Sequence, residues 1–391
     1  MQILLLCYEY PPLGGGGGVG AQQYAEAWAA KGHRVTVLTS GASGLAATEV
    51  VNRVRVLRPF AFGRRSRATA TVPAMLAYNL VGALHLLLRR RDFAPIEVIN
   101  SHFSLPTGPL AALAARLLQR PNVLTIIGGD IYDPSKRSSP HRSPLLRRVN
   151  RWLIEDADRV IAISSDTKRR AEEWYGITRP IEVVNYGFRP SGTGAAVPAA
   201  RDGRGFRLIS VGRLVERKGF AHLVEALAML PEDVELALIG DGPCEGALKQ
   251  LAAAKGVAAR VVFLGYRTRE QIHRHLREAD CYVLSSLHEG LGIVVQEAMD
   301  AGLPVVATNN GGQVDLIREP RNGILVPPAD PAALARAIAT LHRDRALART
   351  IGAHNRIDIR ELDLEKNCER YLDIFRAVAL TGRASVVCDA A

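Results

Sequence analysis

Two acids, Glu289 and Glu297, are separated by seven residues in a stretch whose pattern predicts a strand, a loop and a helix. Glu289 lies in the loop after an apolar run at 281–286, and Glu297 lies about a turn and a half into the helix expected from about 292 to 301. Ligands of open α/β sheets bind at the carboxyl ends of the strands. A phosphate at the helix start, with a carboxylate on each side to accept from hydroxyl groups, suits a nucleotide sugar. The alternative is a βα unit whose acids are only solvated.

The backbone between the two glutamates can itself bind an anion. The N–H groups of Gly292, Ile293 and Val294 open the expected helix and have no acceptor within it, so they form an anion site. Gly290 and Gly292 have no Cβ, which lets a ligand approach the main chain closely. The stretch therefore offers donors for a phosphate and acceptors for hydroxyl groups.

Two cations follow the first strand of the second half of the chain. Arg213 and Lys218 lie in the segment VGRLVERKG, just past the strand expected at 206–211. This position puts them at the same sheet edge as the loop of Glu289. A guanidinium offers a fork of donors and an ammonium offers a point charge, so together they could hold a pyrophosphate. The alternative is two solvated loop residues.

Short apolar runs alternate with helical segments along the whole chain, and this order predicts an α/β fold. In the first half, strands are expected at 3–10, 35–39, 98–103, 122–127, 160–164 and 181–185. In the second half, they are expected at 206–211, 234–239, 261–264, 281–286, 304–308 and 323–326. Such runs are typical of parallel strands that are buried on both faces.

Length and composition predict two domains. A chain of 391 residues is too long for one ordinary core. Residues 189–205 are rich in Gly, Pro, Ala and Arg without apolar periodicity, and they form the expected linker. We therefore expect an N-terminal domain over 1–188 and a C-terminal domain over 206–391, with the last helix, at about 361–378, packing back on the N-terminal domain.

Five glycines, Gly14 to Gly18, follow the first strand and precede a helix expected from about 21 to 30. The unit is a βαβ unit with a glycine-rich first turn, as in mononucleotide-binding halves. A run of five glycines fits many patterns, so it is not a specific dinucleotide motif. Flexibility and close approach to a substrate remain alternatives.

The net charge of +11 comes from the first half of the chain. Residues 1–190 hold 25 Lys and Arg against 14 Asp and Glu, whereas residues 191–391 hold 25 of each. No aromatic-rich sheet, helix-turn-helix or zinc signature accompanies this charge, so nucleic acid is not an expected partner. The excess is clustered at Arg64, Arg65 and Arg67, at Arg89 to Arg91, and at Arg147, Arg148 and Arg151.

An uncharged segment, residues 68–88, lies between the first two of these clusters. Its length could span a bilayer, but Pro73, Asn79, Gly82 and His85 interrupt it. A packed helix, an interfacial helix and a span are the three alternatives. An anionic membrane attracts Lys and Arg. We therefore expect peripheral docking on the inner face of the cytoplasmic membrane through Arg64, Arg65, Arg67, Arg89, Arg90 and Arg91. The alternative is an arginine-rich composition on a freely soluble enzyme.

Other signals predict a cytoplasmic protein without a metal or a bound cofactor. The five cysteines include no C-x-x-C pair, and Cys7 and Cys281 lie in apolar strands, which favours reduced core thiols. The chain starts directly with a strand, so no signal peptide is evident. Asp156 and Asp158 precede a strand, which favours solvated helix-end acids over a metal site.

The chain resembles the retaining glycosyltransferases of family 4 over nearly its whole length. PPLGGGGGVG with KGHRVTVLTS is similar to the N-terminal signature of that family. VGRLVERKG, LIGDGP, VVFLGY and HEGLGIVVQEAMDAGLPVVATNNGG are similar to its donor-domain motifs, and the paired glutamates are the most diagnostic. The resemblance implies the GT-B fold, in which two Rossmann-like domains have parallel sheets that face each other across a cleft.

The resemblance also implies roles on the donor side. Arg213 and Lys218 would bind the donor diphosphate, and Glu297 would accept from the ribose hydroxyls. Glu289 would hold the transferred sugar. The remaining donor-side residues are Gly290, Leu291, Gly292 and Ile293, which would hold sugar and phosphate, and Tyr266 and Arg267, which would pass near the base.

On the acceptor side, His102 in NSHFSLPTG is similar to the sugar-side histidine of the family and would be catalytic with Glu289, Arg213 and Lys218. Without the resemblance, a lone histidine at a strand end favours a structural role. Gly15, Gly16 and Gly17 are similar to the acceptor loop. Asp130 in IIGGDIYD occupies the place of a common acid, but the usual preceding His-Gly pair is missing here.

The implied reaction is the metal-independent transfer of a hexose-type sugar from a UDP- or GDP-linked donor to an acceptor hydroxyl, with retention at the anomeric carbon. Cell-surface polysaccharide, glycolipid or glycoconjugate biosynthesis is the expected context, and the acceptor would be a sugar, a lipid-linked glycan or a small molecule. A sugar-nucleotide epimerase is the first alternative, because it would use the same phosphate contacts without an acceptor. A non-catalytic sugar-binding or lipid-head-group-binding protein is the second, but it would not need both glutamates and both cations.

Overall fold

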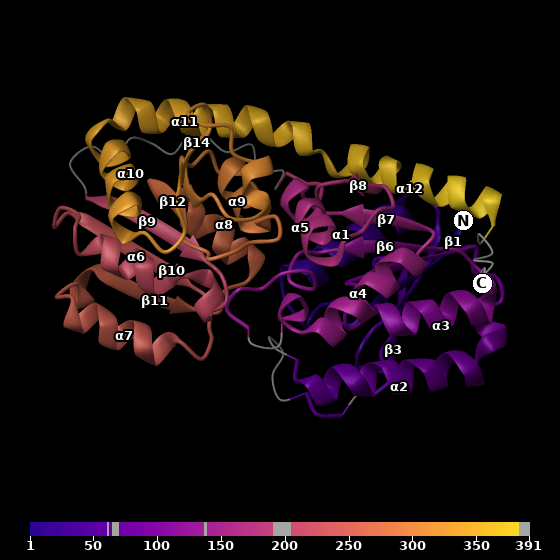
Figure 1. Cartoon of the computed structure of the whole chain (residues 1–391). Coiled ribbons are helices and arrows are strands. Elements are labelled where there is room, and N and C mark those ends of the chain that lie inside the picture. Colours follow the sequence, from indigo (N-terminus) through magenta and orange to yellow (C-terminus); the bar gives the residue numbers. More distant parts are fainter. Residues whose placement is uncertain (61, 65–69, 137–138, 191–204, 383–391) are drawn as a thin grey trace. The chain divides into compact units, whose positions relative to one another are not determined.

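The computed structural model describes residues 1–391 except 61, 65–69, 137–138, 191–204 and 383–391. The chain forms two compact units, which Figure 1 shows in sequence colours. The first unit comprises Met1–Tyr132, Ser138–Gly187 and the segment from Leu364 onwards, and the second comprises Asp133–Arg137 and Phe188–Asp363. Most of the expected linker, and the arginines Arg65 and Arg67, lie outside the described residues.

The first unit is built on an eight-stranded sheet with the order β3-β4-β2-β1-β5-β6-β7-β8. From β1 the chain continues to β2 on one side of the sheet, and from β5 it continues to β8 on the other side. The direction in which successive strands are added therefore changes between β1 and β5, and we call this place the reversal point of the sheet. Pairs β1–β2, β1–β5, β5–β6, β6–β7, β7–β8 and β2–β4 are parallel. The strands are β1 (Gln2–Cys7), β2 (Arg34–Leu38), β3 (Thr48–Val51), β4 (Val54–Leu57), β5 (Val98–His102), β6 (Asn122–Ile126), β7 (Arg159–Ala162) and β8 (Ile181–Val183).

The edge strand β3 and its neighbour β4 form an antiparallel hairpin that the sequence did not predict. The two residues between them, Asn52 and Arg53, have φ angles of 49° and 66°. A two-residue hairpin turn of type I′ needs positive φ at both positions, and glycine at the second position is the usual signal for it. Neither residue is glycine here, and each strand has only four residues. The sequence therefore lacked both the turn signal and a long enough alternating run.

Helices of the first unit pack against this sheet. They are α1 (Gly16–Ala30), α2 (Val72–Leu88), the short η1 (Arg90–Phe93), α3 (Gly108–Leu118), η2 (Pro140–Arg142), α4 (Pro144–Asp156), α5 (Ser165–Tyr175) and α12 (Leu364–Thr381). No helix in the described ranges is long and apolar enough to cross a membrane.

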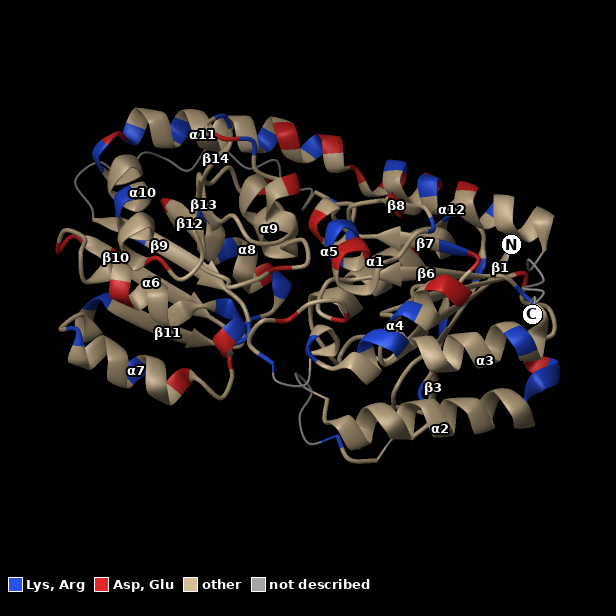
Figure 2. Cartoon of the chain, in the orientation of Figure 1, with Lys and Arg blue, Asp and Glu red and all other residues tan. Residues whose placement is uncertain are grey.

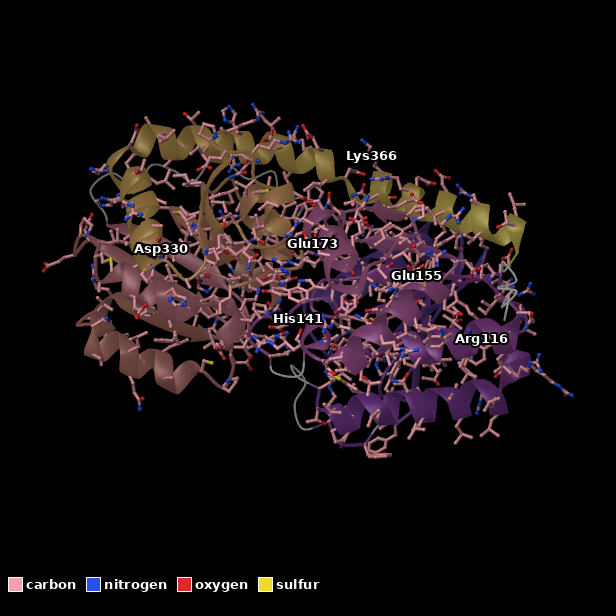
Figure 3. The ribbon with its side chains drawn as sticks, in the orientation of Figure 1. Arg116, His141, Glu155, Glu173, Asp330 and Lys366 are labelled. Carbon is pink, nitrogen blue, oxygen red and sulfur yellow. The ribbon has the colours of Figure 1, made fainter. Side chains whose placement is uncertain are left out.

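Helix α12 packs against α1, although nearly the whole chain separates them in sequence. The ring centroids of Tyr24 and Tyr371 lie 4.6 Å apart, and those of Trp28 and Phe375 lie 5.1 Å apart. Figure 3 shows Lys366 projecting outward from α12. Aromatic contacts therefore fix the inner face of α12 on the first unit.

Helix α1 begins at Gly16, several residues before the expected start near residue 21. Part of the glycine run is therefore the first turn of a helix. A Cβ at Gly17 would lie 2.6 Å from the Phe103 ring, and one at Gly20 would lie 2.3 Å from the Tyr186 ring. Glycine is a poor helix former, but this close packing admits no side chain. Tertiary packing thus overrides the local preference that guided the prediction.

The second unit is built on a six-stranded sheet with the order β11-β10-β9-β12-β13-β14, and all five strand pairs are parallel among the described residues. Its order reverses between β9 and β12. The strands are β9 (Phe206–Val211), β10 (Val234–Ile239), β11 (Val261–Gly265), β12 (Cys281–Leu284), β13 (Val305–Thr308) and β14 (Gly323–Val326).

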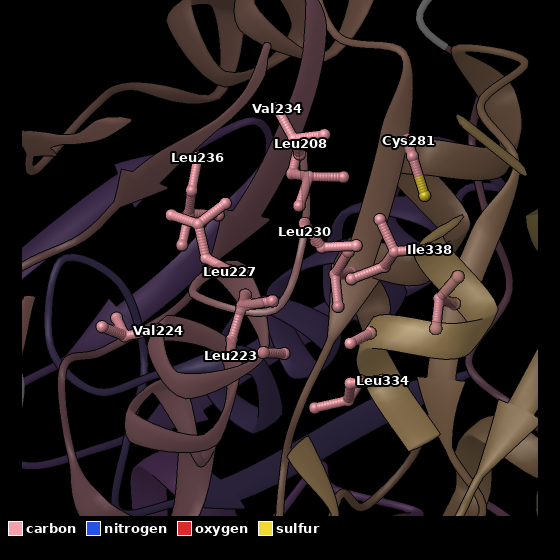
Figure 4. Close-up of a cluster of buried hydrophobic side chains, with 14 of the residues drawn as sticks. Leu208, Leu223, Val224, Leu227, Leu230, Val234, Leu236, Cys281, Leu334 and Ile338 are labelled. Atoms are coloured by element: carbon pink, nitrogen blue, oxygen red, sulfur yellow. The ribbon is translucent and has the colours of Figure 1, made fainter. Parts of the chain in front are cut away.

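Helices cover this sheet and bury its core. Figure 4 shows part of the core, in which Leu208 and Leu236 of the sheet lie near Leu223 and Leu227 of α6. Both halves are thus doubly wound α/β units, as the sequence predicts. The helical segments are η3 (Glu216–Lys218), α6 (Phe220–Leu227), α7 (Glu245–Ala254), η4 (Ala258–Arg260), α8 (Arg269–Arg277), α9 (Ile293–Asp300), η5 (Gly312–Asp315), α10 (Pro331–Arg343), α11 (Arg345–Asp358) and η6 (Ile359–Leu362).

Candidate functional site

The strand order of the second sheet places the segments after β9 and β12 side by side. These two strands are neighbours, while the chain leaves β9 toward β10 and leaves β12 toward β13. Doubly wound sheets bind ligands outside the carboxyl ends of the strands at such a reversal point. Lys218 follows β9 and Glu289 follows β12, so both border the expected ligand position.

Lys218 and Glu289 form a buried ion pair. Lys218 Nζ donates to Glu289 Oε2, and the two side chains are only 13% and 12% exposed. Ser285 Oγ donates to the Lys218 carbonyl at 3.0 Å. Gly219 has a φ of 61°, and a Cβ there would lie 2.1 Å from the Ser285 carbonyl oxygen. Glycine at position 219 therefore lets the segment after β9 approach β12 closely enough for the pair to form.

Cationic neighbours hold Glu289 in its ionised form. Burial alone would raise the pKa of Glu289, but the charges of Lys218 and Arg217 outweigh it and lower the pKa to about 2. Arg217 also donates to the His288 carbonyl at 3.3 Å. Burial lowers the pKa of the Lys218 ammonium, and the charge of Glu289 opposes that effect. At neutral pH, Glu289 is a carboxylate that only accepts hydrogen bonds.

The main chain of Glu289 is tied to the loop after β13. Gly312 N–H donates to the Glu289 carbonyl at 2.8 Å, and Asn310 Nδ2 donates to the Leu287 carbonyl at 2.7 Å. Gly311 has a φ of 137°, and a Cβ there would lie 2.2 Å from the Glu289 carbonyl oxygen. Two neighbouring loops therefore fix the position of Glu289.

Helix α9 starts directly after this loop. Its N-cap residue, Gly292, has a φ of 92° and makes no side-chain capping bond. Gly290 and Leu291 before it are buried. The N–H groups of Ile293 and Val294 precede the first hydrogen bond of the helix, which Val295 N–H donates to the Gly292 carbonyl at 2.8 Å. Such leading N–H groups are the arrangement expected for a phosphate site. Binding of an anion by Gly292 and Ile293 stays a prediction.

Glu297 lies inside α9 and is paired with α8. Its side chain is 9% exposed, and Arg269 Nε lies 3.3 Å from Glu297 Oε1. His273 Nε2 lies 4.0 Å from the same oxygen. Burial raises the pKa of Glu297 to about 6, although Arg269 opposes the shift. The sequence did not predict either of these two neighbours of the carboxylate, Arg269 and His273.

The remaining donor-side residues, Arg213, Tyr266 and Arg267, follow strands β9 and β11 at the same sheet edge. Arg213 is half-buried in the loop after β9, where Leu214 N–H donates to the Asp241 carbonyl at 2.8 Å. Tyr266 follows β11 and is 72% exposed. Arg267 Nη1 donates to the Tyr266 carbonyl at 2.9 Å. This loop leads into Arg269, so its end lies beside Glu297.

In the first unit, His102 ends β5 at the reversal point of that sheet. It is fully buried, with Nε2 2.9 Å from Asn100 Oδ1 and Nδ1 3.2 Å from the Tyr186 hydroxyl. Burial lowers the pKa of His102 to about 3, so the ring is neutral at neutral pH. Both nitrogens have protein partners, as the structural interpretation expects. A contact with a sugar would require one of these partners to be exchanged.

The glycine run follows β1, the neighbour of β5. Gly15 N–H donates to Glu9 Oε2 at 3.1 Å, and a Cβ at Gly14 would lie 2.5 Å from the Glu9 Cβ. Gly17 packs against Phe103, which follows His102. Gly15 to Gly17 and His102 therefore border one position at the reversal point of the first sheet.

Asp130 follows β6 and binds main-chain donors. It is 3% exposed and accepts from the N–H groups of Ser104, Ile127 and Gly128 at 2.7, 3.0 and 2.9 Å. Ser104 Oγ adds a bond of 3.1 Å. Burial raises the pKa of Asp130, although the hydrogen bonds from these donors oppose the shift. In this geometry Asp130 joins the loops after β5 and β6, so it would position them beside an acceptor.

Each unit thus places most of its predicted residues near one reversal point, whereas Tyr266 and Arg267 follow the edge strand β11. Sequence reasoning missed Arg217, Arg269, His273 and Glu9, all of which contact residues at these points. Arg217 lies in the segment VGRLVERKG beside Lys218, so its charge was a usable signal. Arg269 and Glu9 carried no local signal, because their partners are 28 and 6 residues away in sequence and are set by the fold.

Two family models match the chain. Glycosyltransferase Family 4 matches residues 14–191, and Glycosyl transferases group 1 matches residues 198–357. Glycogen synthase of Mycobacterium tuberculosis is 30% identical over 367 residues, which cover 89% of this chain and 87% of that protein.

Solved structures show the same fold. Sucrose-phosphate synthase from Thermosynechococcus elongatus has a TM-score of 0.83 at 22% identity, covering 98% of this chain and 100% of that chain. HepE of Anabaena, solved in complex with UDP-glucose, has a TM-score of 0.75 at 23% identity, covering 96% and 100%. The fold is that of the GT-B glycosyltransferases. The chain belongs to the group 1 glycosyltransferases, with the family 4 N-terminal domain, and this confirms the resemblance read from its motifs.

Proposed function

We propose that this glycosyltransferase moves a hexose-type sugar from a UDP- or GDP-linked donor to an acceptor hydroxyl, with retention of the anomeric configuration. The observation that carries the proposal is the buried pair of Lys218 and Glu289 at the reversal point of the second sheet, next to the uncapped start of α9. This arrangement offers a cation and main-chain donors to a diphosphate, and a carboxylate to sugar hydroxyls.

The donor diphosphate would contact Lys218, Arg213 and the first N–H groups of α9. Negative charge grows on the leaving phosphate as the glycosidic bond breaks, and donors that are already in place stabilise that charge without reorganising. These cations would take the role that a divalent metal plays elsewhere, so we propose a metal-independent reaction. No bound cofactor is needed, because the nucleotide sugar is a co-substrate.

The two glutamates would have different tasks. Glu289, held as a carboxylate by Lys218 and Arg217, would accept from hydroxyls of the transferred sugar. Glu297 would accept from the ribose hydroxyls and would exchange its contact with Arg269 to do so. Tyr266 and Arg267 would lie near the base.

Retention would follow from departure and attack on the same face of the sugar. A double-displacement route needs a carboxylate nucleophile on the opposite face, and the sequence identifies no residue for that task. We therefore favour attack within one ion pair. Neutral His102, with Gly15 to Gly17, would border the acceptor, and Asp130 would position the neighbouring loops.

The nature of the donor is supported by one structural neighbour, HepE, which was solved in complex with UDP-glucose. One relative is a glycogen synthase, which supports a role in polysaccharide or glycoconjugate synthesis. The acceptor would be a sugar, a lipid-linked glycan or a small molecule. We also propose a cytoplasmic location with peripheral docking on the inner face of the membrane.

The test is a panel of UDP, GDP, ADP and their sugars in thermal-shift measurements, followed by transfer assays with the stabilising donor. A nucleotide present at 100 times its dissociation constant adds about 2.7 kcal/mol of stability. NMR of the product should show the same anomeric configuration as the donor. An inverted product would refute retention. A donor epimer formed without any acceptor would instead establish the sugar-nucleotide epimerase, which would use the same phosphate contacts.

A further inference from the structure

Helix α2 exposes a continuous row of large apolar side chains, which we call the leucine stripe. Side chains four residues apart lie on one face of a helix. The residues of the stripe span about half of the circumference of α2. Figure 2 shows α2 without a charged residue along its length. Leu80 is 68% exposed and Leu88 is 76% exposed. The stripe consists of Val72, Leu76, Leu80, Leu84, Leu87 and Leu88.

The opposite face of α2 is fixed on the first unit. Asn79 Nδ2 donates to the Pro106 carbonyl at 2.8 Å, and Leu110 N–H donates to Asn79 Oδ1 at 3.1 Å. A Cβ at Gly82 would lie 2.6 Å from a Leu110 methyl carbon, so α2 and α3 are in close contact. The Tyr78 hydroxyl donates to the Leu38 carbonyl at 3.3 Å. Rotation of α2 to bury the stripe would break these contacts.

Exposed aromatic residues extend the stripe at its amino-terminal end. Phe60 and Phe62 are 63% and 59% exposed. Their loop is joined to the start of α2, because Thr71 Oγ1 donates to the Gly63 carbonyl at 2.7 Å. Large apolar surfaces on soluble proteins mark interaction sites, and aromatic side chains favour the boundary between lipid and water.

Exposed arginines follow the stripe at its carboxyl-terminal end. Arg89, Arg90 and Arg91 are exposed, and Arg89 lies 3.7 Å from Asp92, the nearest acid in sequence. A cavity beside Arg89 is lined by Arg55 and His85 among others. Arg64, at the other end, is half-buried and lies 3.5 Å from Ser40 Oγ. Among the described arginines of the two clusters, Arg89 to Arg91 are exposed and can present the docking charge, whereas Arg64 is half-buried.

We propose that the leucine stripe docks the first unit on an anionic lipid bilayer, with Phe60, Phe62 and the stripe in the interface and Arg89 to Arg91 among the lipid phosphates. An interfacial helix inserts its apolar face to the headgroup boundary and gains further affinity from cationic side chains. A second copy of the chain suits this face less well. Antiparallel pairing would offer the arginines no acidic partner on α2, and parallel pairing would bring the two arginine clusters together.

This inference rests on the proposed function in one respect, which is that docking would bring the enzyme to a membrane-borne acceptor. The docking itself requires no catalysis. The proposed nucleotide site lies in the second unit, so docking and donor binding can be measured separately on the same variant.

The experiment is co-sedimentation of the full chain with vesicles of phosphatidylcholine, alone or mixed with an equal amount of phosphatidylglycerol. The test variant is Leu76→Gln/Leu80→Gln/Leu84→Gln. The control replaces Leu113, Leu145 and Leu380 by Gln, since these leucines are exposed on other helices. We expect the test variant to lose at least tenfold in affinity for the anionic vesicles, and the control to bind as the unchanged chain does.

A second pair of variants tests the charge. Arg89→Gln/Arg90→Gln/Arg91→Gln should weaken binding to anionic vesicles at least tenfold at low salt and should have little effect at high salt. The matched control, with the exposed Arg120, Arg148 and Arg151 replaced by Gln, removes the same charge elsewhere and should bind normally.

Three results would overturn the proposal. They are wild-type binding that ignores phosphatidylglycerol, unchanged binding of the stripe variant, and self-association in sedimentation velocity that the stripe variant abolishes. The last result would make the stripe an interface between copies. The thermal shift caused by UDP or GDP should be the same in every variant, so its absence in all of them would count against the proposed donor and leave the docking test intact.

Discussion

Lys218 and Glu289 are 71 residues apart in sequence, and their side chains meet because β9 and β12 are neighbours in the second sheet. Each pKa depends on the partner, since removal of Lys218 leaves Glu289 buried with Arg217 as its main remaining cation, and removal of Glu289 leaves the Lys218 ammonium buried without its carboxylate. The pair is therefore both a structural contact and the proposed centre of the donor site.

We predict that Lys218→Met destabilises the second unit more than removal of both charges. The single variant leaves the buried Glu289 carboxylate without its partner, and loss of one member of a buried pair costs about 3 kcal/mol or more. Lys218→Met/Glu289→Gln should recover at least half of that loss. The measurement is urea unfolding, with Lys249→Met as the control because its contact with Glu245 is exposed. Equal stability of the single and double variants would contradict this coupling.

The sequence predicts the strands and the edge at which these residues lie, because parallel strands are continuous apolar runs and their loops carry the polar residues. It does not predict which side chains pair. Arg269 reaches Glu297 only because α8 packs beside α9. The sequence also does not predict which face of α2 is buried, because both sides of that helix are apolar and only the fold decides which one is covered.

We predict that the two glutamates affect different kinetic parameters. Glu289→Ala should depress turnover, with nucleotide affinity little changed, because its carboxylate would contact the transferred sugar. Glu297→Ala should mainly weaken nucleotide binding, because its carboxylate would contact the ribose. Steady-state kinetics and calorimetry with the nucleoside diphosphate measure both effects. The assignment of roles fails if both variants lose affinity for the nucleotide equally.

We predict that turnover survives EDTA, because Lys218, Arg213 and the start of α9 would neutralise the leaving phosphate. Rates should change less than twofold after chelation and dialysis. A tenfold loss that magnesium or manganese restores would refute the metal-independent reaction. Lys218→Gln should lower the rate with or without added metal, which separates loss of the protein cation from loss of an ion.

The last prediction concerns pH and follows from the pKa of Glu297, which burial raises to about 6. Above pH 6 the carboxylate can accept from the ribose, and below it the added proton removes that acceptor. Nucleotide affinity should therefore fall as the pH decreases from 7 to 5, by up to tenfold per pH unit below 6.

Stability of the free protein should change in the opposite direction. A carboxyl group whose pKa is higher in the folded state favours folding when protonated, so its contribution is present below the unfolded pKa near 4.5 and is lost as the pH rises through about 6. The size of this effect is about 2 kcal/mol. Glu297→Gln should flatten both profiles, whereas Glu270→Gln, at an exposed acid on the neighbouring helix α8, should leave them unchanged. An affinity profile that keeps its slope in Glu297→Gln would assign the titration to another group.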